Sequence, residues 1–172
     1  VIGTGRIGRR LIRMLTGWDM NIIAYDPMPN KELTDEYHFT YVPLDQLLSS
    51  SDIISIHVPL LPTTKHLIDK PAIKKMKKGV YIVNTARGGI IDSEALLWGL
   101  EQNIVAGAGL DVLEDEDLLE DPLKLLCDTC TEEHTRTSLM NNMIIDHPRT
   151  IVTPHNAFNT TEAITRILDT TI

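Results

Sequence analysis

The sequence predicts an α/β fold, a doubly wound parallel sheet with helices on both faces. Short β-branched runs alternate with amphipathic runs along the 172 residues. The apolar runs at 53–57 and 80–84 are nearly continuous, which is typical of parallel strands buried on both faces. A G-x-G-x-x-G turn follows the first two apolar residues and opens an amphipathic run at 9–15.

That turn has the pattern that holds the pyrophosphate of a dinucleotide. Gly3 permits a tight strand-to-helix turn, Gly5 lets the backbone approach the phosphates, and Gly8 lets the helix pack close to its strand. The helix start offers free N–H groups and a favourable dipole. Asp26 ends the next predicted strand, 21–26, close to the place of the acid that binds a ribose 2′-hydroxyl. We therefore predict a Rossmann-type domain; the alternative is a tight turn without a ligand.

The later elements keep the alternation. Helices are predicted at 30–36, 43–50, 71–77 and 92–102, and strands at 38–42, 53–57, 80–84, 104–112 and 150–153. Asn159 with Glu162 resembles a capping box before a last helix, whose apolar face is formed by Ala163, Ile164, Ile167 and Leu168. Residues 114–149 break the rhythm and are predicted to be an insertion or a long loop.

Composition narrows the function classes. A content of 42% hydrophobic and 23% charged residues is that of an ordinary soluble domain, and the net charge of −8 argues against nucleic acid as a partner. No apolar run approaches the about 20 residues of a membrane span, and we expect no signal peptide. We expect no membrane partner and a cytoplasmic location.

The chain itself is expected to be one dinucleotide-binding domain over residues 1–172, cut inside its first strand. Only Val1 and Ile2 precede the glycine turn, where a strand of about 5 residues is expected.

Cys127 and Cys130 form a C-x-x-C with His134 four residues further on. A zinc site needs a fourth ligand, and a redox motif needs a different context. We predict no metal and two reduced thiols, with a metal or redox role as the alternative.

Chemically useful side chains follow the strands at their carboxyl ends, where ligands bind in such sheets. Arg87 follows the strand at 80–84, acids follow the strand at 104–112, and His155 follows the last strand. An arginine can clamp a carboxylate, a histidine can transfer a proton near neutral pH, and a carboxylate can orient that histidine. Beside a nicotinamide, this set predicts hydride transfer to a 2-keto acid. Singly, each is more often a surface or loop residue.

The motifs resemble those of the D-isomer-specific 2-hydroxyacid dehydrogenases over nearly the whole chain. The matching segments are 3–8, 57–60, 84–88, 109–114 and 153–155. The resemblance implies that Arg87 binds the substrate carboxylate, that His155 is the acid/base, and that Glu116 is its partner, with Glu114 as the alternative. It implies NAD as cofactor, held by Gly3, Gly5, Arg6, Ile7, Gly8, Asp26, Val58, Pro59, Thr64, Thr85, Ala86, Arg87 and Asp111.

Within this family, residues 25–27 and 155–158 are most similar to the D-lactate dehydrogenases. The resemblance implies a small 2-hydroxy or 2-keto acid substrate, a homodimer, and a second, substrate domain that is absent here. Phe158 is expected either to close an apolar substrate pocket or to pack under the last helix. The alternatives are another D-2-hydroxy acid (glycerate, isocaproate-type or phosphoglycerate), an NAD(H)-binding regulatory scaffold of corepressor type, and the Rossmann domain of an unrelated oxidoreductase.

Overall fold

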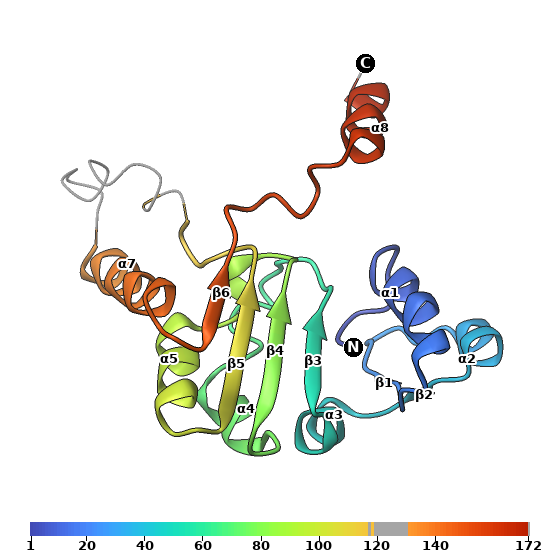
Figure 1. The fold of residues 1–172 in the computed structure, drawn as a ribbon, viewed down its shortest axis with the longest axis horizontal. Coiled ribbons are helices and arrows are strands. Elements are labelled where there is room, and N and C mark those ends of the chain that lie inside the picture. The colour runs from blue at the N-terminus through green and yellow to red at the C-terminus, as the bar shows by residue number, and fades with distance from the viewer. Residues whose placement is uncertain (117, 119–130, 172) are drawn as a thin grey trace.

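The sheet is parallel in all of its described strand pairs, which confirms the predicted fold class. The computed structural model describes residues 1–116, 118 and 131–171 (Figure 1). One group of strands pairs in the order β3 (Ile53–Ile56), β4 (Val80–Asn84), β5 (Val105–Leu110), β6 (Thr150–Val152), and a second pairs β1 (Ile23–Ala24) with β2 (Thr40–Tyr41). Ile2 joins the groups, because it bridges to Tyr25 on one side and to Ile56 on the other. The glycine turn after Ile2 therefore lies where the strand order reverses, the usual ligand position.

Helices follow the strands and several begin at polar caps. They are α1 (Gly8–Leu15), α2 (Lys31–Tyr37), α3 (Leu44–Ser50), α4 (Lys70–Lys75), α5 (Ser93–Glu101), α7 (Glu132–Ile145) and α8 (Thr161–Thr171), with short 3-10 turns η1 (Thr16–Trp18) and η2 (Gly88–Ile90). Asn30, Asp69 and Asp92 accept hydrogen bonds from first-turn N–H groups of α2, α4 and α5. These bonds satisfy donors that a helix start otherwise leaves free.

The main core lies between the four-stranded group and the helices α3, α4 and α5, which stand behind it in Figure 1. Ile54, Ile56 and Ile82 of the strands and Leu96 and Leu100 of α5 are fully buried there. A second core, Val1, Ile12, Ala24, Leu33 and Phe39, joins α1 and α2 to β1. These two cores fix the positions of the loops at the carboxyl ends of the strands.

The prediction of an insertion or long loop at 114–149 is wrong for residues 132–145, which form α7. Thr131 caps this helix together with His134, in place of the usual Glu or Gln. The buried residues of α7 are Ser138, Asn141 and Ile144. Because two of these are polar, the helix lacks the apolar stripe by which amphipathic helices are found. Cys127 and Cys130 lie outside the described residues.

Several predicted boundaries also shift. The strands at 21–26 and 38–42 are reduced to β1 and β2. β2 cannot begin at residue 38, because His38 ends α2 in a left-handed conformation. Asp69 starts α4 at Lys70 rather than residue 71, and the helix ends at Lys75. Pro43 precedes α3 as its N-cap residue.

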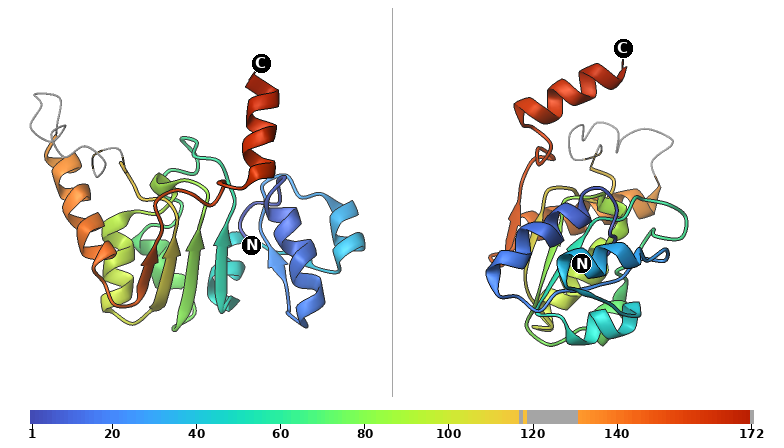
Figure 2. Two further views of the ribbon diagram at one scale, coloured as in Figure 1. Left: turned by 45° about the horizontal axis from the view of Figure 1, so that its top comes forward. Right: turned by 90° about the vertical axis from the view of Figure 1, so that its right-hand side faces the viewer.

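The last helix stands clear of the sheet (Figure 2). The predicted Asn159 cap is wrong, since Thr160 Oγ1 accepts the hydrogen bond from Ala163 N at 3.2 Å. Ile164 and Leu168, which belong to its predicted apolar face, are 41% and 57% exposed. Among the described residues, none of the helices is long and apolar enough to cross a bilayer.

Candidate active site

The glycine turn has the geometry that its sequence predicts. Gly3 has a φ of +91°, and a Cβ there would lie 2.9 Å from the His57 carbonyl. A Cβ on Gly8 would lie 2.0 Å from the Gly3 oxygen, so glycine is needed for the close approach of helix and strand. A Cβ on Gly5 would meet nothing within 4 Å, which leaves open space beside the backbone. The residues therefore fit a pyrophosphate lying over Gly5.

Asp26 lies directly beside this turn. Its Oδ2 accepts from Thr4 N at 2.8 Å and from Thr4 Oγ1 at 2.9 Å, and its Oδ1 accepts from Met28 N at 2.9 Å. Three donors leave a carboxylate with about one further acceptor position. Asp26 thus holds the glycine turn and still offers an acceptor where a ribose hydroxyl is expected.

A cleft of about 320 Å³ opens over the turn, a size typical of ligand sites. Predicted cofactor residues that line it are Gly3, Gly5, Asp26, Val58, Pro59 and Thr64; lining residues that were not predicted to bind the cofactor are Tyr25, Pro27, His57, Leu61, Thr63 and Leu67. Most of the missed residues adjoin a predicted one in the sequence, which is the signal that could have found them.

The loop after β3 gives this cleft a mostly apolar wall, formed by Val58, Pro59, Leu61 and Leu67. Thr64 Oγ1 donates to Pro59 O at 2.6 Å and accepts from Leu61 N at 2.8 Å, which closes the loop after β3. Burial lowers the pKa of His57 to about 4. The ring is therefore neutral at neutral pH and adds no positive charge to the cleft.

The remaining predicted cofactor residues lie outside the cleft lining. Ile7 is 67% exposed and Arg6 is exposed, both on the glycine turn. Thr85, Ala86 and Arg87 lie on the loop after β4.

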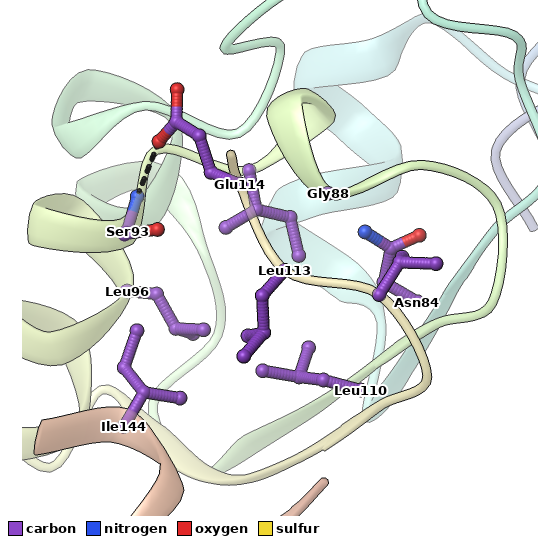
Figure 3. A pocket seen from close by; sticks show the side chains of 10 residues that line it. Asn84, Gly88, Ser93, Leu96, Leu110, Leu113, Glu114 and Ile144 are labelled. Atoms are coloured by element: carbon purple, nitrogen blue, oxygen red, sulfur yellow. Dashed lines mark hydrogen bonds between the residues drawn. The ribbon is translucent and has the colours of Figure 1, made fainter. Parts of the chain in front are cut away.

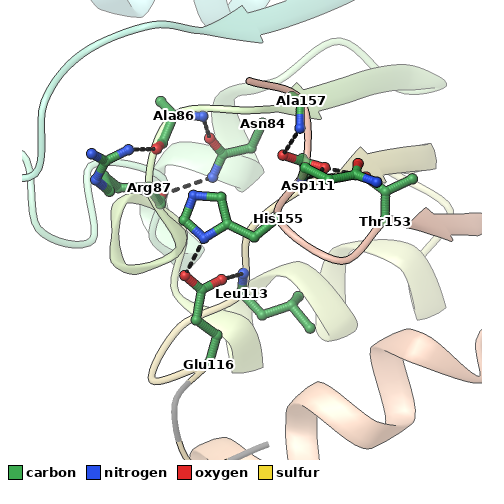
Figure 4. Close-up of polar contacts among 10 residues, drawn as sticks. Asn84, Ala86, Arg87, Asp111, Leu113, Glu116, Thr153, His155 and Ala157 are labelled. Atoms are coloured by element: carbon green, nitrogen blue, oxygen red, sulfur yellow. Dashed lines mark hydrogen bonds and ion pairs between the residues drawn. The ribbon is translucent and has the colours of Figure 1, made fainter. Parts of the chain in front are cut away.

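Asn84, which the motifs did not single out as a site residue, holds that loop in place. It is fully buried at the end of β4; its Nδ2 donates to Arg87 O at 2.9 Å and its Oδ1 accepts from Ala86 N at 3.0 Å. The Arg87 side chain is exposed, and its Nη1 donates to Ala86 O at 2.6 Å (Figure 4). Within the described part of the chain, Arg87 makes no ion pair, so most of its five donors are available to a ligand.

His155 and Glu116 are in direct contact. The distance between His155 Nδ1 and Glu116 Oε1 is 2.6 Å, and Glu116 Oε2 accepts from Leu113 N at 3.3 Å. The other ring nitrogen faces the loop of Arg87 (Figure 4). A carboxylate on Nδ1 selects the tautomer with its proton there, which leaves Nε2 to exchange a proton with a ligand.

Glu114, the alternative partner, points elsewhere. Its Oε1 contacts His66 Nε2, and its side chain is about 10% exposed, against 34% for Glu116. Of the two carboxylates, only Glu116 reaches His155 in this structure.

Asp111 is 4% exposed and is directed at the loop of His155. It accepts from Thr153 Oγ1, from Asn156 N at 3.1 Å and from Ala157 N at 2.8 Å. Burial raises the pKa of this carboxyl. The hydrogen bonds and the nearby His155 together lower the pKa by more than burial raises it, so it lies below its ordinary value of 3.8. Asp111 therefore braces the loop on which His155 adopts a φ of +45°.

Phe158 does not pack in the core. It is 52% exposed, and its ring stands edge-on to His155 with centroids 6.0 Å apart. The expectation that it packs under the last helix is wrong, whereas its place beside His155 agrees with a pocket wall.

No three potential ligands gather as a metal site among residues 1–116, 118 and 131–171. The parallel sheet, the glycine turn at its switch point and the acid after β1 define a dinucleotide-binding α/β domain.

Comparison with known proteins gives the family. The family described as D-isomer specific 2-hydroxyacid dehydrogenase, NAD binding domain, matches residues 1–157. The chain belongs to this family and is an NAD-binding domain.

Three similar proteins illustrate its range. A D-lactate dehydrogenase of Treponema pallidum is 41% identical over 95% of this chain and 47% of its own length. An aromatic 2-oxoacid reductase of Clostridium sporogenes is 38% identical over 100% of this chain and 50% of its own length. The structure of an Aquifex aeolicus D-lactate dehydrogenase with NAD and lactic acid has a TM-score of 0.85 and 36% identity, over 99% of this chain and 49% of that one. The chain spans about half the length of the curated relatives it matches.

Proposed function

We propose that the protein reversibly transfers hydride between NAD(H) and a small D-2-hydroxy acid or 2-keto acid, with D-lactate and pyruvate as the pair. The observation that carries this proposal is the His155–Glu116 contact of 2.6 Å beside the exposed guanidinium of Arg87, which makes no ion pair within the described residues. A carboxylate clamp and an oriented acid/base, next to an NAD-binding cleft, are what reduction of a 2-keto acid requires.

In this proposal each side chain has one task. NAD, when bound, supplies the hydride acceptor or donor. Arg87 binds the carboxylate of the acid and draws the adjacent carbonyl toward its positive charge. Protonated His155 gives the proton at Nε2 to the oxygen on C2 during reduction, and neutral His155 takes it during oxidation. Glu116 holds Nδ1–H and stabilises the imidazolium.

A short substrate is supported by the ring of Phe158 beside His155, which narrows the space at the acid/base. Aromatic acids are the second candidate, since an aromatic 2-oxoacid reductase is 38% identical to this chain and a D-lactate dehydrogenase is 41% identical. The proposal includes a second, substrate domain in the whole protein, a homodimer and a cytoplasmic location.

The test is NADH oxidation by the complete protein with pyruvate, followed by absorbance, for wild type and His155→Asn. Asparagine tolerates the left-handed backbone but cannot act as acid or base. We expect turnover to fall about 10²–10⁴-fold in the variant. Turnover only with larger 2-keto acids would overturn the lactate assignment. Tight NADH binding without turnover of any 2-keto acid would overturn the assignment as a dehydrogenase and favour a regulatory scaffold.

A further inference from the structure

Glu114, two residues before Glu116, belongs to a second histidine–glutamate pair, which the proposed reaction does not use. Glu114 Oε1 contacts His66 Nε2. Glu114 Oε2 accepts from Ser93 N at 3.4 Å, the dashed line in Figure 3. Asn141 of α7 is fully buried; its Nδ2 donates to Glu114 O at 2.6 Å and its Oδ1 accepts from Ser93 Oγ at 2.8 Å. The loop of His66, the start of α5 and the helix α7, which are far apart in the sequence, thus all hold Glu114 in place.

On the other side of this pair, His66 lies on the loop that forms one wall of the NAD cleft. Its neighbours Thr64 and Leu67 line the cleft. His66 N donates to Gly89 O at 2.9 Å, and Ile68 N donates to Ile90 O at 3.1 Å, so the loop is fixed to the segment after Arg87. The contact with Glu114 therefore connects the cofactor wall to the turn after β5.

That turn also carries Glu116. Glu114 and Glu116 are separated only by Asp115, whose φ is +48°. The turn presses against Gly88, where a Cβ would lie 1.9 Å from Leu113 O. Glu116 then folds back to accept from Leu113 N and contacts His155. Glu114 and Glu116 thus contact two different histidines from one short turn, so the contact of Glu114 with His66 restricts the position of Glu116.

We propose that Glu114 and His66 are positioning residues, which hold the turn at 113–116 so that Glu116 reaches His155. The acid/base role of His155 rests on the proposed function; the positioning itself does not. A merely structural pair would stabilise the fold without affecting the hydrogen bond between His155 and Glu116.

The first readout is spectroscopic and needs no turnover. A ring N–H donated to a carboxylate forms a charge-assisted hydrogen bond, and its proton resonance lies far downfield. In the complete protein we expect Glu116→Gln to abolish this resonance of His155 and Glu114→Gln to move it upfield or broaden it away. The matched control is Glu94→Gln, which breaks the exposed Glu94–Arg136 pair of 2.7 Å between α5 and α7. An unchanged His155 resonance in folded Glu114→Gln would overturn the proposal.

The second readout is a double-variant cycle with the 2-keto acid that the protein turns over. We expect Glu114→Gln to lower kcat about tenfold with little change in KM, and Glu114→Gln/Glu116→Gln to be no slower than Glu116→Gln alone. If the losses in kcat of the two single variants multiply in the double variant, Glu114 does not act through Glu116 and the proposal is overturned. If Glu114→Gln does not fold, His66→Gln, expected to act in the same direction, takes its place in both readouts. If the protein turns over no 2-keto acid but Glu114→Gln still shifts the His155 resonance, the proposed function is refuted and the positioning role stands.

Discussion

Substitution of Asp111 by asparagine should release the loop that carries His155. The carboxylate accepts from Thr153 and Asn156 through Oδ1 and from Ala157 through Oδ2. In the variant the amide oxygen can replace only one of these carboxylate oxygens. The amide NH₂ then faces a backbone N–H, so at least one donor loses its partner.

The size of the effect follows from these contacts. A hydrogen bond to a charged acceptor contributes about 1.5–3 kcal/mol, and a buried donor left unpaired costs about 1–3 kcal/mol. Water can reach Ala157 N in part, because the residue is exposed. We therefore expect Asp111→Asn to lower the free energy of unfolding by about 2–3 kcal/mol at neutral pH.

The pH dependence gives the reasoning its sharpest test. The pKa of Asp111 is lowered in the folded protein, so its stabilisation is present above 3.8 and is lost as the pH falls through the folded value. Urea unfolding at neutral and at strongly acid pH should show a difference between wild type and variant that narrows in acid. Asp52→Asn, at an exposed carboxylate paired with Lys77, is the control. Equal unfolding free energies of wild type and Asp111→Asn at neutral pH would refute the reasoning.

Four further results are expected. Gly88→Ala should cost about 3 kcal/mol in urea unfolding, because its Cβ would overlap the Leu113 carbonyl; a wild-type midpoint would contradict this. Burial lowers the pKa of His57 to about 4, so the free energy of unfolding should fall as the pH drops from 6.5 to about 4. His57→Gln should remove about 2 kcal/mol of this loss, after allowance for partial exposure of the ring. An unchanged pH dependence in the variant would argue that burial of His57 does not cause the loss. Asp26→Ala should reduce the preference for NADH over NADPH about tenfold to hundredfold in kcat/KM, since it removes repulsion of the 2′-phosphate; an unchanged ratio would exclude that repulsion. Phe158→Ala should change the rank order of 2-keto acids in kcat/KM, and an unchanged order would exclude a pocket role.

The sheet was predictable because its signals are local. Runs such as 53–57 and 80–84 are β-branched and bounded by turns, and α5 begins after its cap Asp92, at the start of the helix predicted at 92–102. The helix α7 was missed because it buries Ser138 and Asn141, and the value of a buried polar residue depends on partners elsewhere in the chain. Periodicity cannot reveal such a helix.

The site divides in the same way. Arg87, His155 and the glycine turn belong to motifs that the sequence displays. Which of Glu114 and Glu116 contacts His155 depends on the fold of one turn and on two histidines that are distant in the sequence. The sequence alone could therefore not decide between the two glutamates. The bracing by Asn84 and Asn141 lies equally beyond sequence patterns, because both act through tertiary contacts.

The left-handed backbone at three site residues limits how far this domain can be made more stable. His66, Asp115 and His155 have φ values of +52°, +48° and +45°, and each such residue costs about 1–2 kcal/mol relative to glycine. Glycine at position 115 would relieve that cost and keep both carboxylates. Glycine at position 66 or 155 would also relieve strain, but it would remove an imidazole of the site. A search for thermostable variants should therefore enrich changes at position 115 and leave both histidines in their strained conformation.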